Sequence, residues 1–183
     1  MQKNQTNDNM FGNGIHWDSR LSKAQVMAIA RDLHHDERGI EDTFAMMMQA
    51  ADNRAAYNAA WILTHLSQTD KNVYLLPKYA EIVRMATSAA TCFRRGLILA
   101  ILSDLPIAGE PNSDLLDFCL KHITDTKEYV SARSSMIKLA ARMCKPYPEL
   151  CTELTLCLDM IPQGISPSIA SAKRKALKTI AKR

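Results

Sequence analysis

Glycine and proline are scarce in this sequence, with six and seven residues respectively among 183. Ala, Leu, Met, Lys and Arg are abundant, and their side chains lose little rotamer freedom in a helix. The hydrophobic content of 47% is normal for a folded protein. We therefore expect a packed, all-α protein.

Long apolar runs are also missing, since none approaches the roughly 18 to 20 residues that a membrane span requires. The N-terminus is too polar for a signal-peptide core. The five cysteines are an odd number, form no CxxC pair and lie mostly in apolar helical stretches, which is typical of reduced thiols that act as small hydrophobes. These features predict a cytoplasmic protein without a membrane segment.

Motifs for catalysis or cofactor binding are absent, because no GxGxxG, P-loop, GxSxG or HExxH pattern occurs. The stretch His34-His35-Asp36-Glu37 contains groups that bind metals. Adjacent residues of a helix, however, point about 100° apart and do not easily share one ion. We interpret this stretch as the end of the first helix, and we expect no metal, no cofactor and no catalytic residue.

The chain divides into a polar N-terminal tail, residues 1–18, and a helical domain, residues 19–183. Ser22 opens the first helix with the capping-box sequence Ser-Lys-Ala-Gln, and apolar residues then follow on one face of that helix. This helix is expected to cap the domain. Turns are predicted at residues 67–72, 105–112 and 145–148, where helix-breaking residues cluster.

Four basic residues recur at intervals of 40, 39 and 40 positions, namely Arg54, Arg94, Arg133 and Lys173. Each lies near the start of an apolar helical pattern, here called a B helix, and follows another such pattern, an A helix. The A helices are expected to begin near residues 40, 77, 112 or 113, and 148. A period of about 40 residues indicates repeated helix pairs.

The segment Asn53-Arg-Ala-Ala-Tyr-Asn-Ala-Ala-Trp-Ile-Leu resembles the second helix of a HEAT repeat, in which an Arg precedes spaced alanines and a leucine. The resemblance covers about residues 40–183. It implies a right-handed α-α superhelix, or solenoid, of four degenerate HEAT-like pairs behind the capping helix. It also implies that the four basic markers are structural, each bonding an acidic or carbonyl partner, for which Asp52 and Asp125 are candidates.

Charge is sorted between the two kinds of helix, since the B helices are basic and the A helices largely acidic. In HEAT-like proteins the B helices line the concave surface, so a basic concave face is implied. Its hypothesised binding residues are Arg95, Lys138, Arg142, Arg174 and Lys178. Half of the basic excess falls in residues 173–183, however, where cations also stabilise a helix C-terminus.

The favoured function is a non-enzymatic protein-binding scaffold, because HEAT-like arrays present surfaces to other molecules. An acidic protein is the first candidate partner, and nucleic acid, held through its phosphates, is the second. A HEAT-like DNA glycosylase would need an aromatic residue and a carboxylate beside an extruded base. Trp61 could supply the aromatic ring, but no carboxylate follows it within two helical turns.

Overall fold

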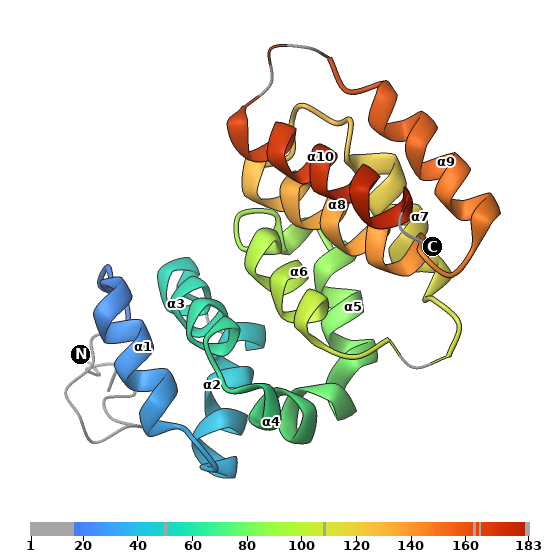
Figure 1. Ribbon diagram of the computed structural model, residues 1–183. Coiled ribbons are helices and arrows are strands. Elements are labelled where there is room, and N and C mark those ends of the chain that lie inside the picture. The colour runs from blue at the N-terminus through green and yellow to red at the C-terminus, as the bar shows by residue number, and fades with distance from the viewer. Residues whose placement is uncertain (1–16, 50, 108, 163, 165, 182–183) are drawn as a thin grey trace. The chain divides into compact units, whose positions relative to one another are not determined.

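The computed structural model describes residues 17–49, 51–107, 109–162, 164 and 166–181, and all regular elements among them are helical (Figure 1). The all-α prediction is confirmed. Residues 1–16, which make up most of the predicted tail, lie outside the described part. The chain forms two compact units, Met1–Asp70 and Lys71–Arg183, here called unit 1 and unit 2.

Unit 1 contains a capping helix, one helix pair and a short helix: α1 (Lys23–Asp32), α2 (Glu37–Gln49), α3 (Asn53–Thr64) and α4 (Gln68–Asp70). The predicted capping box is confirmed, since Gln25 N donates to Ser22 Oγ at 3.3 Å while Ser22 N donates to Gln25 Oε1 at 2.8 Å. Helix α3 packs against both α1 and α2. The first B helix is therefore covered on two sides.

Asn58 lies four positions after Arg54, whereas the residues four positions after the other three markers are apolar, namely Ile98, Ile137 and Leu177. Its side chain is buried, and its amide donates hydrogen bonds of 2.8 Å to the carbonyl oxygens of Trp17 and Ser19. A buried amide needs such partners. Asn58 thus ties the segment before α1 to α3.

Unit 2 contains three helix pairs, α5 with α6, α7 with α8 and α9 with α10, and α8 lies between α6 and α10 in a row of B helices (Figure 1). Its elements are the π-helical η1 (Lys71–Leu75), the 3₁₀ turn η2 (Leu76–Lys78), α5 (Tyr79–Thr87), the 3₁₀ turn η3 (Ala89–Thr91), α6 (Arg95–Asp104), α7 (Ser113–His122), α8 (Val130–Cys144), α9 (Pro148–Asp159) and α10 (Pro167–Ala181). No helix in the described residues is long and apolar enough to cross a membrane.

The starts of two predicted A helices agree with the structure. Asn112 caps α7, and α9 begins at Pro148. The predicted turn at residues 67–72 is wrong, because Gln68–Asp70 is α-helical and π-helix follows it. The predicted helix start at Pro77 is wrong too, since Pro77 lies in η2.

Gly96 marks a close approach of α6 to α8. A Cβ atom at this position would lie 2.9 Å from Ser131 Oγ and 3.1 Å from the backbone nitrogen of Ala132. The Ser135 hydroxyl also donates to the Gly96 carbonyl oxygen, at 3.2 Å. The two helices are therefore packed backbone to backbone at this point.

Replacing Gly96 with valine is expected to lower the free energy of unfolding by about 1–2 kcal/mol, because overpacking forces the backbones apart. Chemical denaturation followed by circular dichroism measures this change. An unchanged midpoint would mean that α8 can shift away from α6 at no cost.

Candidate functional site

Arg95, one of the five predicted binding residues, is buried. Its Nε donates to the Ala86 carbonyl oxygen at 2.9 Å, an Nη donates to the Ser88 carbonyl oxygen at 2.7 Å, and the guanidinium forms an ion pair with Glu128. The last carbonyls of a helix have no partner within the helix, and Arg95 supplies one at the end of α5. Its burial corrects the expectation that it belongs to an exposed binding face.

Arg142, a second predicted binding residue, closes the end of α6 in the same way. Its guanidinium donates to the Leu105 carbonyl oxygen at 2.6 Å and to the Ser103 carbonyl oxygen as well. The side chain is half-buried and its charge stands at a helix C-terminus, where a cation is stabilising. Arg142 is thus engaged in joining α8 to α6.

The four repeat markers have different environments. Arg133 is buried and its Nε donates to the Ile123 carbonyl oxygen at 2.8 Å, which joins α8 to α7. Arg94 is also buried, but its Nε has no hydrogen-bond partner, and burial lowers its pKa below the usual value. Lys173 forms an ion pair with Asp159 at 3.3 Å, and Arg54 is exposed.

The two candidate carboxylate partners bond backbone groups. Asp52 Oδ1 accepts from the backbone N–H groups of Arg54 and Ala55 at 2.7 and 2.8 Å, and so caps α3. Asp125 accepts from the backbone N–H of Lys127 at 2.8 Å, which with its other contacts lowers the pKa of this carboxyl. Both therefore shape the chain before a B helix.

Lys138 on α8 and Arg174 and Lys178 on α10 are exposed, and we call these three residues the B-face cations. Neither α8 nor α10 contains an acidic residue. Within the part of the chain that the structure describes, no ion pair joins a B-face cation to a carboxylate.

Contacts between α8 and α10 determine how far along the helix axes these cations lie relative to one another. The hydroxyl oxygens of Ser134 and Ser168 lie 2.8 Å apart, and the two helices run in the same direction (Figure 1). At about 1.5 Å per residue, Lys138 and Arg174 differ in height by about 3 Å along the helices. The first two B-face cations thus lie at similar levels on neighbouring helices.

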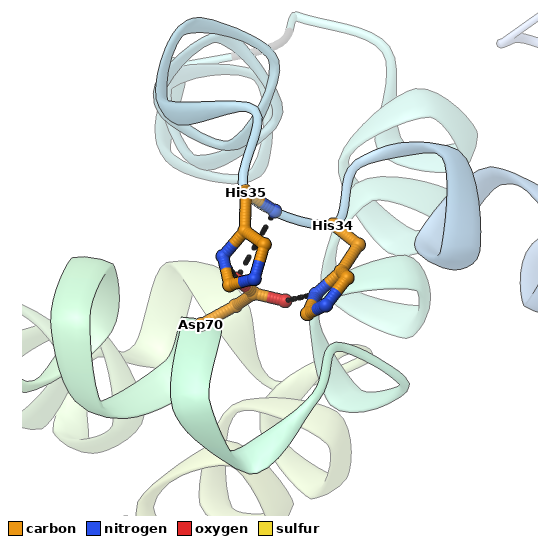
Figure 2. Close-up of side chains that lie close together, drawn as sticks. All are labelled: His34, His35 and Asp70. Atoms are coloured by element: carbon orange, nitrogen blue, oxygen red, sulfur yellow. Dashed lines mark hydrogen bonds and ion pairs between the residues drawn. The ribbon is translucent and has the colours of Figure 1, made fainter.

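A second cluster lies in unit 1, where His34 and His35 meet Asp70 of α4 (Figure 2). His34 Nδ1 lies 2.8 Å from Asp70 Oδ2, and the backbone N–H of His35 donates to Oδ1 at 3.2 Å. The Ser67 hydroxyl donates to Oδ2 at 2.6 Å. Burial alone would raise the pKa of Asp70, but the hydrogen bonds from His34, Ser67 and His35 outweigh it and lower the pKa.

Sequence reasoning missed this cluster because it treated His34 and His35 as neighbours on one helix. Helix α1 ends at Asp32, and the two histidines follow on a turn in which His35 has a φ of 60°. The signal that could have located Asp70 is the spacing Ser67-x-x-Asp70, which is typical of a helix start. That spacing lay inside a predicted turn.

Surface pockets among the described residues of unit 1 include one beside the cluster and one beside Trp61. One, of about 350 Å³, lies beside the cluster and is lined by Met27, Ala30, Arg31, His34, His65, Ser67 and Asp70. The other, of about 540 Å³, is lined by Arg20, Leu21, Ser22, Gln25, Arg54, Tyr57, Asn58 and Trp61. Trp61 therefore lines a pocket, but this pocket has no carboxylate among its lining residues.

Cysteine burial is uneven, with Cys119, Cys144 and Cys151 buried, Cys157 half-buried and Cys92 exposed. Burial raises the pKa values of Cys119 and Cys144 to about 12. Because the thiolate is the reactive form, both should resist a thiol reagent at pH 8 in the folded protein, whereas Cys92 should react. Peptide mass spectrometry after labelling checks this, and a Cys119 that labels as fast as Cys92 would contradict the buried position.

Comparison with known families shows that the family model for the HEAT repeat domain matches residues 16–180. Searches of curated proteins and of solved structures found no significant match. The matched region includes the capping helix and the helix pairs of both units. The chain therefore belongs to the HEAT repeat family.

Proposed function

We propose that the chain is a non-enzymatic protein-binding scaffold whose B-face cations, Lys138, Arg174 and Lys178, bind an acidic segment of a partner protein. HEAT repeats generally mediate protein interactions, which supports the scaffold role. The observation that carries the choice of partner is that exposed cations stand on two adjacent helices without acidic neighbours on either helix. The free cysteines support a reducing compartment such as the cytoplasm.

An acidic protein fits this surface better than a nucleic acid. Single strands gain much of their affinity from bases that stack on aromatic side chains, and α8 and α10 contain no Phe, Tyr or Trp. Three cations would also neutralise few phosphates. A short acidic segment needs only a few matching charges.

The test uses a fluorescent oligoglutamate peptide as a defined acidic probe, with binding followed by anisotropy at low salt. Reversing Lys138, Arg174 and Lys178 to glutamate should weaken binding about tenfold or more, because each exposed pair contributes about 0.2–1 kcal/mol. The matched control reverses Arg84, Lys121 and Lys127, which are exposed outside the B helices. It changes the net charge equally and should retain more of the affinity.

Two outcomes would overturn the proposal. Equal losses in the two triple variants would show that the peptide responds to net charge and not to the B-face cations. Tighter binding of duplex DNA, with a steep dependence on salt, would place nucleic acid ahead of an acidic protein.

A further inference from the structure

The cluster in unit 1 brings together three side chains that are common metal ligands. One ligand atom from each of His34, His35 and Asp70 lies within 4.8 Å of the others. His34 Nδ1 is 2.8 Å from Asp70 Oδ2, and His35 Nδ1 is 3.5 Å from Asp70 Oδ1. Ligand atoms of a tetrahedral zinc ion, at bond lengths of about 2.0–2.2 Å, stand about 3.2–3.6 Å apart. The separation between His35 Nδ1 and Asp70 Oδ1 lies in this range. The shorter separation between His34 Nδ1 and Asp70 Oδ2 is that of a hydrogen bond, which a bound ion would replace.

Asp70 is already oriented as a metal-ligating carboxylate would be. Its side chain is 1% exposed and is held by the Ser67 hydroxyl and by the backbone N–H of His35. Outer hydrogen bonds of this kind fix the direction of a ligand and strengthen metal binding. Asp36 does not compete for this position, because its Oδ1 accepts from the backbone N–H of Gly39 at the start of α2.

The two imidazoles are free to adjust around an ion. The side chains of His34 and His35 are 51% and 65% exposed, and their ring centroids lie 3.8 Å apart. Admitting an ion requires these rings to rotate apart, and little packing opposes that movement. The pocket beside His34 and Asp70 leaves room for a water molecule as a further ligand.

The backbone at His35 also holds the cluster together. Its φ of 60° lies in the left-handed region, which residues with a Cβ rarely adopt. In this conformation both the backbone N–H and the ring of His35 face Asp70 (Figure 2). Strain of this kind clusters at ligand sites, where the surrounding structure maintains it.

We propose that His34, His35 and Asp70 bind one divalent transition-metal ion of the zinc class. Two nitrogen donors and one carboxylate suit Zn²⁺, Co²⁺ or Ni²⁺, whereas Mg²⁺ and Ca²⁺ require mostly oxygen ligands. The ion would link the turn between α1 and α2 to α4, and would thereby stabilise unit 1.

Isothermal titration of the full, chelator-treated chain with Zn²⁺ tests the proposal. One ion should bind per chain, and His34→Gln and His35→Gln should each weaken binding at least tenfold. Both histidines are exposed, so these variants should remain folded, which circular dichroism checks. Ser67→Ala should weaken binding about tenfold through the carboxylate that it orients, while His122→Gln in unit 2 should bind as the wild type does.

Co²⁺ gives a spectroscopic readout of the donor atoms, and d–d bands without a sulfur charge-transfer band are expected. Such a charge-transfer band would place the ion on a cysteine and overturn the proposal. So would the absence of saturable binding up to about 100 μM Zn²⁺, or unchanged affinity in the His34 and His35 variants. Loss of binding in His16→Gln alone would locate the site elsewhere in the chain.

Discussion

Replacing Arg95 with methionine is expected to lower the free energy of unfolding by about 3–5 kcal/mol, the usual cost of breaking a buried ion pair from one side. The Arg95 and Glu128 side chains are 4% and 11% exposed. Removal of the guanidinium leaves the Glu128 carboxylate buried without its cation, and its Oε2 already lacks a hydrogen-bond partner. The carbonyl oxygens of Ala86 and Ser88 lose their donors in the same step.

The adjacent Arg94 provides the matched control, because it is also buried but lacks comparable bonds. Its Nε has no hydrogen-bond partner, and its guanidinium carbon lies 5.2 Å from the centre of the Phe93 ring. Methionine would forfeit a cation–π contact that contributes about 0.5–2 kcal/mol but would also remove a desolvated charge. Arg94→Met should therefore stay within about 1 kcal/mol of the wild type.

Urea denaturation of the two variants, with slopes and midpoints compared to the wild type, separates the two roles. If only Arg95→Met greatly lowers the free energy of unfolding, the hydrogen bonds and ion pair of Arg95 stabilise the contact between α5 and the segment before α8. Equal losses in both proteins would mean that buried side-chain volume, and not the bonded guanidinium, is what stabilises this region.

These adjacent arginines show why residue spacing predicted the helix pairs but not which arginine bonds the preceding A helix. Arg94 fits the period of about 40 residues, yet the residue that bonds an A-helix carbonyl, as Arg133 does, is Arg95. Successive residues on a helix point about 100° apart, so a shift of one position exchanges a bonded side chain for an unbonded one. Helix α6 begins at Arg95 after the 3₁₀ turn η3, and this boundary was not visible in the sequence.

Helix starts that are fixed by capping residues close by in the sequence could be predicted from the sequence. The capping box at Ser22 needed only the neighbouring residues, and it is confirmed. The cluster around Asp70 was not predictable in this way, because its bond to His34 joins residues 36 positions apart. A turn with a left-handed residue, which places His34 and His35 against α4, has no simple sequence signature.

Asp70→Asn is the substitution with the second largest expected effect, a loss of about 2–4 kcal/mol in the free energy of unfolding when chelator is present. The ionised carboxylate accepts from His34, His35 and Ser67 at once. Asparagine has nearly the same shape but presents an NH₂ group in place of one oxygen. An NH₂ group cannot accept a hydrogen bond. Where it replaces Oδ2, the Ser67 hydroxyl and His34 Nδ1 would face a donor instead of an acceptor.

Denaturation of Asp70→Asn beside Asp32→Asn checks this prediction, because both substitutions remove one negative charge and Asp32 is exposed. Asp32→Asn should change stability by less than about 0.5 kcal/mol. If Asp70→Asn is equally mild, the carboxylate is not what anchors the turn between α1 and α2. Because chelator is present throughout, a large loss would measure the hydrogen bonds of the carboxylate alone, and any added stabilisation of the wild type by Zn²⁺ could then be assigned to the ion.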